Sequence, residues 1–247
     1  MSQLEKGIRI NKYLSEIGFC SRREADRLIE QGRIRINGIV SLMGQKVSGD
    51  EKIEVNGKLM TISKSKNIYL AFNKPRGIVC TTDQKREKNN IIDFINYPSR
   101  VFPIGRLDKM SEGLIFLTND GDIVNKILRA KNNHEKEYIV EVNKPITDDF
   151  TKMMSNGVPV LDTVTNKCFV KKTGKKTFRI VLTQGLNRQI RRMCEYFGYK
   201  VTYLQRIRIM NISLDIPVGE YRDFTAKELN QIHQSVKHSA KIFEGNK

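Results

Sequence analysis

The sequence contains few of the residues that build metal, disulfide and redox sites. Its 247 residues include four cysteines, three histidines and no tryptophan. No Cys-x-x-Cys pair occurs and the histidines show no ligand spacing, so we expect no structural zinc. The cysteines are far apart in the chain, which favours free thiols in a reducing compartment, the cytoplasm. The residues concerned are Cys20, Cys80, Cys168, Cys194, His134, His233 and His238.

Long apolar runs and phosphate-binding loops are also missing. No stretch of about 18 apolar residues occurs, so we expect no membrane span. Residues 1–10 carry charges and lack the apolar core of a signal peptide. The chain has no dinucleotide or Walker-type glycine loop, no deaminase signature, and no readable Ser–His or Cys–His nucleophile arrangement. What remains is chemistry of carboxylates, aromatic rings and arginines, for which we expect no cofactor.

Basic residues are the abundant class. Lysine and arginine number 44 against 27 aspartates and glutamates, a formal net charge of +17. Such an excess suits a polyanionic partner, most often nucleic acid, although a merely soluble basic protein would also fit. A hydrophobic content of 39% argues against wholesale disorder.

The first sixty residues predict a small module of two helices followed by short strands. Apolar residues recur at helical spacing over 10–17, and Ser21 with Glu24 forms a capping box for a second helix. Asn-Gly pairs at 37–38 and 56–57 predict two hairpins. The polar segment that follows has no helical stripe and is interpreted as a linker.

These signals predict two domains of different construction. We place the N-terminal module at 1–62, a second domain at 67–238 and a frayed tail at 239–247. In the second domain strands and helices are mixed without regular βαβ alternation, which predicts an α+β fold with a largely antiparallel sheet flanked by helices. Strands are expected near 68–72, 78–81, 114–117, 138–142 and 178–182, and helices near 123–128, 190–197 and 225–236.

Arginines gather at the start of the second helix and on the next strand. They are Arg22, Arg23 and Arg27 on the helix and Arg33 and Arg35 on the strand. They form either a solvated basic face or a phosphate-binding surface, and the total charge favours the latter. The helix–helix–strand layout with its Arg-Arg pair resembles the S4 RNA-binding domain over about residues 8–60.

The segment 105–121 contains the most informative carboxylate. Asp108 follows Arg106 by two positions in a glycine-bounded turn. The turn leads into the apolar run 114–117, which predicts a buried strand. A carboxylate on a tight turn beside a core strand is a rigidly placed reactive group.

Several segments in order resemble the motifs of the pseudouridine synthases. Gly105–Gly121, with its Gly-Arg-Leu-Asp core, resembles motif II, and Lys74-Pro75-Arg76-Gly77 is similar to motif I. His134–Tyr138 resembles the segment that bears the active-site tyrosine, and Gln184–Met193 resembles motif III. With the S4-like module in front, the chain resembles the RsuA/RluB/RluF group of the family, most closely its RluF branch.

This resemblance implies a cofactor-free isomerisation of uridine in RNA. The N1–C1′ glycosidic bond breaks, the base turns, and C5 bonds to C1′. Asp108 is the implied catalytic residue, either as nucleophile or as the base that abstracts the 2′ proton. Because a stacked uracil cannot react, base flipping is expected, at a cost of a few kcal/mol.

The resemblance also implies roles for neighbouring residues. Tyr138 would stack on the uracil, although its spacing alone fits a core tyrosine. Arg191 would form a bidentate ion pair with Asp108, and Arg106 would occupy the vacated space or bind phosphate; each could otherwise be a surface arginine. Further RNA contacts are expected from Lys74, Arg76, Arg188 and Arg192.

The implied partner is ribosomal RNA, with 23S ribosomal RNA as the expected target and a tRNA loop as an alternative. The absence of an exposed apolar helix stripe favours a monomer. Two other classes of function stay open. One is a non-catalytic S4-type RNA-binding protein. The other is a glycoside hydrolase that pairs Asp108 with Glu112 or Asp120 across about 5–10 Å.

Overall fold

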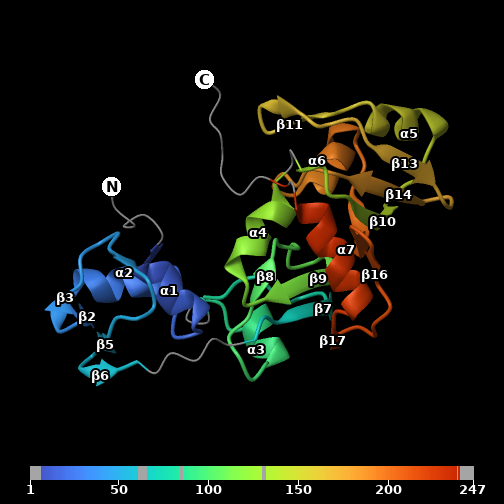
Figure 1. Ribbon diagram of the computed structural model, residues 1–247. Helices are drawn as coiled ribbons and strands as arrows, with labels where there is room; N and C mark the ends of the chain where they lie inside the picture. Colours follow the sequence, from blue (N-terminus) through green and yellow to red (C-terminus); the bar gives the residue numbers. More distant parts are fainter. Residues whose placement is uncertain (1–6, 61–65, 84–85, 130–131, 238, 240–247) are drawn as a thin grey trace. The chain divides into compact units, whose positions relative to one another are not determined.

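The computed structural model divides the chain into two compact units, Met1–Asn67 and Ile68–Lys247 (Figure 1). It describes residues 7–60, 66–83, 86–129, 132–237 and 239. Each unit buries apolar clusters of its own, so each has the core that an independent fold needs. Of the tail expected to fray, only Ser239 lies within the described residues.

Two short helices form one side of the N-terminal unit. They are α1 (Ile10–Glu16) and α2 (Arg22–Glu30). The Ser21 hydroxyl accepts the Glu24 N–H at 3.1 Å, which satisfies a backbone donor at the start of α2 as predicted. Ala25, Leu28 and Ile29 form the buried stripe of α2, and its remaining positions carry the charged residues.

Short antiparallel strands complete this unit. The order in the four-stranded sheet is β3 (Ile39–Val40), β2 (Ile34–Ile36), β5 (Ile53–Val55) and β6 (Lys58–Leu59). The strand β1 (Ile8–Arg9) pairs separately with β4 (Lys46–Val47). The two Asn-Gly pairs connect β2 to β3 and β5 to β6, so both predicted hairpins are confirmed.

The second unit is built on a nine-stranded sheet. Along its main path the order is β13 (Phe169–Lys172), β14 (Thr177–Leu182), β10 (Lys136–Val142), β15 (Val201–Ile209), β9 (Glu112–Thr118), β7 (Tyr69–Lys74) and β17 (Tyr221–Asp223). The strand β8 (Phe102–Ile104) pairs with β9, and β16 (Ile212–Ser213) pairs with β15. A separate ribbon joins β11 (Pro159–Val160) to β12 (Thr163–Val164). Among the described pairings β9–β15 is parallel and the others are antiparallel.

Helices cover both faces of this sheet. Alternate residues of β7 and β9 point to opposite faces of the sheet, so each strand contributes side chains to two apolar clusters. One cluster packs against α3 (Ile91–Ile95), α5 (Asp148–Ser155) and α6 (Gln189–Tyr196). The other packs against α4 (Gly121–Leu128) and α7 (Ala226–Val236). The α+β prediction with a largely antiparallel sheet is therefore confirmed.

One predicted strand is wrong. Residues 78–81 form only an isolated bridge between Val79 and Asn90, not a strand. The reason lies in Lys74, whose buried Nζ donates to the Pro75 and Ile78 carbonyls at 2.7 and 2.8 Å. These bonds hold the chain in a tight turn after β7, away from the ladder that continued pairing would require.

Candidate active site

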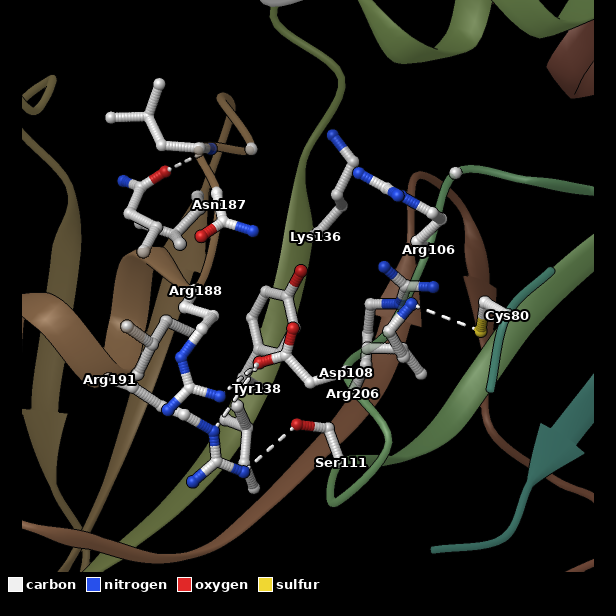
Figure 2. Close-up of a pocket in the computed structure, with 18 of the residues that line it drawn as sticks. Cys80, Arg106, Asp108, Ser111, Lys136, Tyr138, Asn187, Arg188, Arg191 and Arg206 are labelled. Atoms are coloured by element: carbon white, nitrogen blue, oxygen red, sulfur yellow. Dashed lines mark hydrogen bonds and ion pairs between the residues drawn. The ribbon is translucent and has the colours of Figure 1, made fainter. Parts of the chain in front are cut away.

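A pocket of about 470 Å³ opens beside the loop that carries Asp108. Its walls come from the 105–111 loop, from β10 and β15, and from the segment between β14 and the first turn of α6. Figure 2 shows Asp108 and Tyr138 near its centre with arginine side chains around them. Six lining side chains are basic and one is a carboxylate, namely Arg106, Lys109, Lys136, Arg188, Arg191, Arg206 and Asp108.

Hydrogen bonds to backbone groups of residues 107–111 hold the Asp108 loop in place. The Leu107 N–H donates to Cys80 Sγ at 3.3 Å, and the Gly77 N–H donates to the Lys109 carbonyl at 2.7 Å. The Ser111 N–H closes the turn onto the Asp108 carbonyl at 3.0 Å. The side chain of Asp108 is 30% exposed and faces the pocket, so the sequence prediction of a rigidly placed carboxylate agrees with this geometry.

Gly113 determines which strand lies next to that loop. Its φ is +104°, and a Cβ there would lie 2.3 Å from the Arg206 carbonyl oxygen. Only glycine permits so close an approach of two backbones. Residue 113 therefore allows the parallel pairing of β9 with β15, and this pairing brings Arg206 to the pocket.

Arg191 lies against Asp108 and is held in place by other groups. Its Nε is 3.5 Å from Asp108 Oδ2, whereas its terminal nitrogens donate to the Ser111 hydroxyl and the Val201 carbonyl at 3.2 and 3.3 Å. The expected bidentate geometry is wrong, because these other acceptors occupy the second edge of the guanidinium. Burial lowers the pKa of Arg191, and the charge of Asp108 opposes that shift.

A second arginine reaches the same carboxylate oxygen. Arg188 has a nitrogen 3.9 Å from Asp108 Oδ2, and its side chain is 47% exposed. It is the left-handed residue that precedes α6, with φ +52°. Arg188 thus contributes positive charge at the mouth of the pocket, while Arg191 lies inside.

Tyr138 and two buried cations form another part of the wall. Tyr138 is 9% exposed and pairs across the sheet with Arg206, whose Cζ lies 6.0 Å from the tyrosine ring centroid. Lys136 precedes Tyr138 by two positions on β10, and both side chains line the pocket. Burial, with a contribution from Arg206, lowers the pKa of Lys136 to about 8.

The remaining predicted contact residues do not share one environment. Arg76 and Arg106 are exposed, and Arg106 lines the pocket. Arg192 donates to the Asn187 carbonyl at 3.0 Å and is not part of the pocket wall. Lys74 is fully buried and bonded to two carbonyls, so the expected contact of Lys74 with RNA is wrong.

The carboxylate pair of a glycoside hydrolase is not assembled. Glu112 accepts a bond from the Tyr203 hydroxyl at 2.6 Å, and Asp120 caps α4 while accepting the Tyr69 hydroxyl at 2.8 Å. Neither lines the pocket, where Asp108 is the one carboxylate among the described residues. A mechanism with facing acid and base carboxylates therefore has no basis here.

Two buried cations of the pocket, Lys136 and Arg206, received no role from the sequence. The available signal was the Lys-x-Tyr spacing on β10, which puts Lys136 on the same face as Tyr138. No local signal identifies Arg206, because its position depends on strand order.

Within the described residues no three histidine, cysteine, aspartate or glutamate side chains cluster as a metal site would require.

The four arginines of the N-terminal unit that the sequence predicts to bind RNA are all exposed. They are Arg22, Arg23, Arg27 and Arg33. Arg27 pairs with Glu24, and Arg33 donates to Asn56. In the described part of the chain Arg22 and Arg23 make no ion pair, which leaves their guanidinium groups open to a phosphate.

No helix of the described residues is long and apolar enough to cross a membrane.

Comparison with protein families gives two matches. Residues 68–196 match the RNA pseudouridylate synthase family, and residues 8–53 match the S4 domain. A dual-specificity RNA pseudouridine synthase RluF from Salmonella typhi is 58% identical over 94% of this chain and 81% of its own length. The protein of that name from Escherichia coli K12 is 57% identical over 96% of this chain and 82% of its own length.

More distant relatives agree. The ribosomal large subunit pseudouridine synthase B of Bacillus subtilis is 32% identical over 95% of this chain and 99% of its own length. A crystal structure of a pseudouridylate synthase superposes with a TM-score of 0.67 at 27% identity, covering 91% of this chain and 99% of that one. The chain therefore belongs to the RNA pseudouridylate synthase family and is an RNA pseudouridine synthase with an S4 domain in front.

Proposed function

We propose that this enzyme converts uridine in 23S ribosomal RNA to pseudouridine, with Asp108 as the catalytic residue. The observation that carries the proposal is a pocket in which the described residues supply one carboxylate and six basic side chains, in a member of this family. The net positive wall suits RNA, and the single carboxylate suits a reaction that needs one acidic group and no cofactor.

The reaction requires no co-reactant, because product and substrate are isomers. The N1–C1′ bond breaks, a C5–C1′ bond forms, the C5 proton is lost and N1 gains a proton. Asp108 would act at C1′ or at the 2′ position. In either role Arg191, 3.5 Å away, orients the carboxylate and balances its charge. Tyr138 would stack on the flipped uracil and exclude water from it.

The second part of the proposal concerns the range of substrates. The relatives with 57–58% identity are named dual-specificity enzymes, and the Bacillus subtilis relative is named for the large ribosomal subunit. We infer that a structured tRNA loop is a second substrate. We also infer that the enzyme acts as a monomer in the cytoplasm, a reducing compartment that suits its four free cysteine thiols.

The test compares Asp108→Asn with the unmodified protein on ribosomal RNA and tRNA transcripts. Asp108→Asn keeps the shape and removes the negative charge, so pseudouridine formation should fall below detection, with RNA affinity within about twofold. Asp162→Asn, an exposed site elsewhere in the same unit, is the matched control and should keep full activity.

Product analysis distinguishes the alternatives. A C-glycoside that stays in the chain indicates isomerisation, and released uracil would indicate hydrolysis. Activity of Asp108→Asn near that of the unmodified enzyme would refute the proposed role of Asp108. Modification of tRNA alone would refute the ribosomal assignment.

A further inference from the structure

Two buried cations in the pocket wall, Arg206 and Lys136, have few hydrogen-bond acceptors around them. Arg206 is 4% exposed and Lys136 is 7% exposed. In Figure 2 they lie apart from Arg188 and Arg191, the two arginines nearest the Asp108 carboxylate. They therefore form a distinct part of the site, for which the ion pair of Asp108 gives no explanation.

The hydrogen-bonding capacity of these two side chains is largely unused. Arg206 Nε donates to the Leu114 carbonyl at 2.7 Å, but its Nη2 is buried without a partner. Lys136 Nζ donates once, to the His134 carbonyl at 3.2 Å, and has two further hydrogens. Neither makes an ion pair in the described part of the chain.

Leaving such groups unpaired is costly for the folded protein. A buried donor without an acceptor costs free energy, and a buried charge without a counter-charge costs more. The two cations also repel each other, which contributes to the lowered pKa of Lys136. A ligand that brings acceptor oxygens into the pocket would remove this cost, so the arrangement is suited to a bound state.

The burial of the two groups indicates which part of a nucleotide they meet. The phosphates of RNA stay near the surface, where the exposed Arg106 and Arg188 line the pocket. Arg206 and Lys136 instead lie beside the buried ring of Tyr138. A base that stacks on this ring would present its edge to them.

The edges of uracil and cytosine differ in what they offer to donors. Uracil carries carbonyl oxygens at C2 and C4, whereas cytosine carries an amino group at C4. Lysine and arginine are donors only. Uracil therefore satisfies both cations, whereas cytosine would bring its amino donor against one of them and leave that cation unpaired.

We propose that Lys136 and Arg206 recognise the target base by donating to its carbonyl oxygens, and thereby select uridine over cytidine. This inference rests on the proposed function of the same pocket. In this proposal Lys136 on β10 and Arg206 on β15 select the base, and Asp108 takes part in breaking and making the bonds.

The first experiment replaces Lys136 in the full-length chain. Lys136→Met keeps the apolar stem and removes the charged donor, so kcat/KM on uridine RNA should fall by on the order of 10- to 100-fold. The melting temperature at pH 7 should stay the same or rise, since a buried unpaired cation is removed. Lys227→Met, at an exposed position on α7, is the control and should change neither quantity.

The pH dependence separates this role from a structural one. Lys136 is charged below about pH 8 and neutral above it, so the kcat/KM of the unmodified enzyme should decline as pH rises through about 8. In Lys136→Arg the side chain stays charged, so this decline should disappear. The stability gain of Lys136→Met should be full below pH 8 and shrink toward 10.5, the ordinary pKa of lysine.

Other charged groups around Lys136 do not account for a change near pH 8. They are Arg206 on β15, His134 on its own segment, and Arg106, Asp108 and Cys80 across the pocket. Arginine stays protonated throughout this range. Burial lowers the pKa of His134 and raises that of Cys80, which moves both titrations away from pH 8.

A binding experiment tests the choice of base without catalysis. In the Asp108→Asn background, RNA with uridine at the target position should bind more tightly than RNA with cytidine. Adding Lys136→Met should reduce this preference to within about twofold. An unchanged preference together with an unchanged pH profile would overturn the inference.

The outcomes also separate this inference from the proposed function. If Asp108→Asn is inactive and Lys136→Met keeps normal kcat/KM, the base-recognition inference alone is wrong. If Asp108→Asn stays active, the proposed function fails whatever Lys136 does. Should Lys136→Met fold poorly, the pH profile of Lys136→Arg still decides the question.

Discussion

The arginines of the N-terminal unit and those of the pocket carry the same charge in opposite surroundings. Arg22 and Arg23 on α2 are exposed and make no ion pair with described residues. Arg206 is 4% exposed and the Arg191 side chain 11%, and both are held by backbone carbonyls. Exposed cations release counterions when they meet phosphate, whereas buried cations hold a fixed geometry.

The difference teaches which task each region is suited to. A surface of free arginines binds RNA with little dependence on sequence and with a strong dependence on salt. In the pocket the cations are held in fixed positions, and this places Asp108 and a bound base in the relative geometry that the reaction requires. Substitutions in the two regions should therefore have effects of different kinds and sizes.

The largest expected effect is on stability and comes from Gly113, which we compare with Gly38, a glycine that also has a positive φ but no close neighbour. Gly113→Ala would put a Cβ 2.3 Å from the Arg206 carbonyl oxygen, so the second unit should lose at least about 3 kcal/mol of unfolding free energy. Gly38→Ala in the N-terminal hairpin meets no atom within 4 Å and should cost only about 1 kcal/mol, from its φ of +82°. Urea denaturation measures both, and equal costs would contradict the close approach of β9 and β15.

A smaller loss is expected from Arg191→Ala, measured as kcat at saturating RNA. Removing the side chain frees Asp108 from its ion pair and from the contact with Ser111, so kcat should fall by about 10²-fold. Arg192→Ala is the matched control on the next position of α6. Its side chain does not line the pocket and bonds to the Asn187 carbonyl, so kcat should change by less than about threefold. Equal mild losses would show that the ion pair does not matter.

The smallest expected effect is on affinity alone. Replacing Arg22, Arg23 and Arg27 together by glutamine should weaken RNA binding about 10-fold at physiological salt and reduce the slope of log Kd against log salt by about 2. The kcat at saturating RNA should stay unchanged. The control replaces three exposed lysines of the second unit, Lys152, Lys227 and Lys237, with the same change in charge. An equal slope change in both proteins would show that α2 has no special role.

Local patterns in the sequence predicted much of this architecture. Helix starts at Ser21 and Thr225, hairpins at the Asn-Gly pairs, and the strand after Asp108 all depend on neighbouring residues, and the structure has them. The place of Asp108 on a tight turn followed from the same local logic. Such features could be predicted because capping, turn and alternation preferences operate over a few residues.

Predictions that depended on burial were less secure. Lys74 in a basic turn was expected to meet RNA, but packing of the sheet buries it and supplies two carbonyl acceptors. Arg191 was expected to form a bidentate ion pair with Asp108, but its terminal guanidinium nitrogens donate to Ser111 and Val201. In both residues the partners lie on segments whose contact only the folded chain creates.

By itself, the sequence determined the basic charge, the order of the motifs, the local turns and the identity of the one carboxylate in the pocket. Tertiary structure decided which cations surround that carboxylate. Arg206 reaches the pocket because Gly113 lets β15 lie parallel to β9, 93 positions apart at the paired residues 113 and 206. The buried state of Lys136 and Arg206 likewise depends on strand order, since burial is a property of the packed sheet and not of any local run of residues.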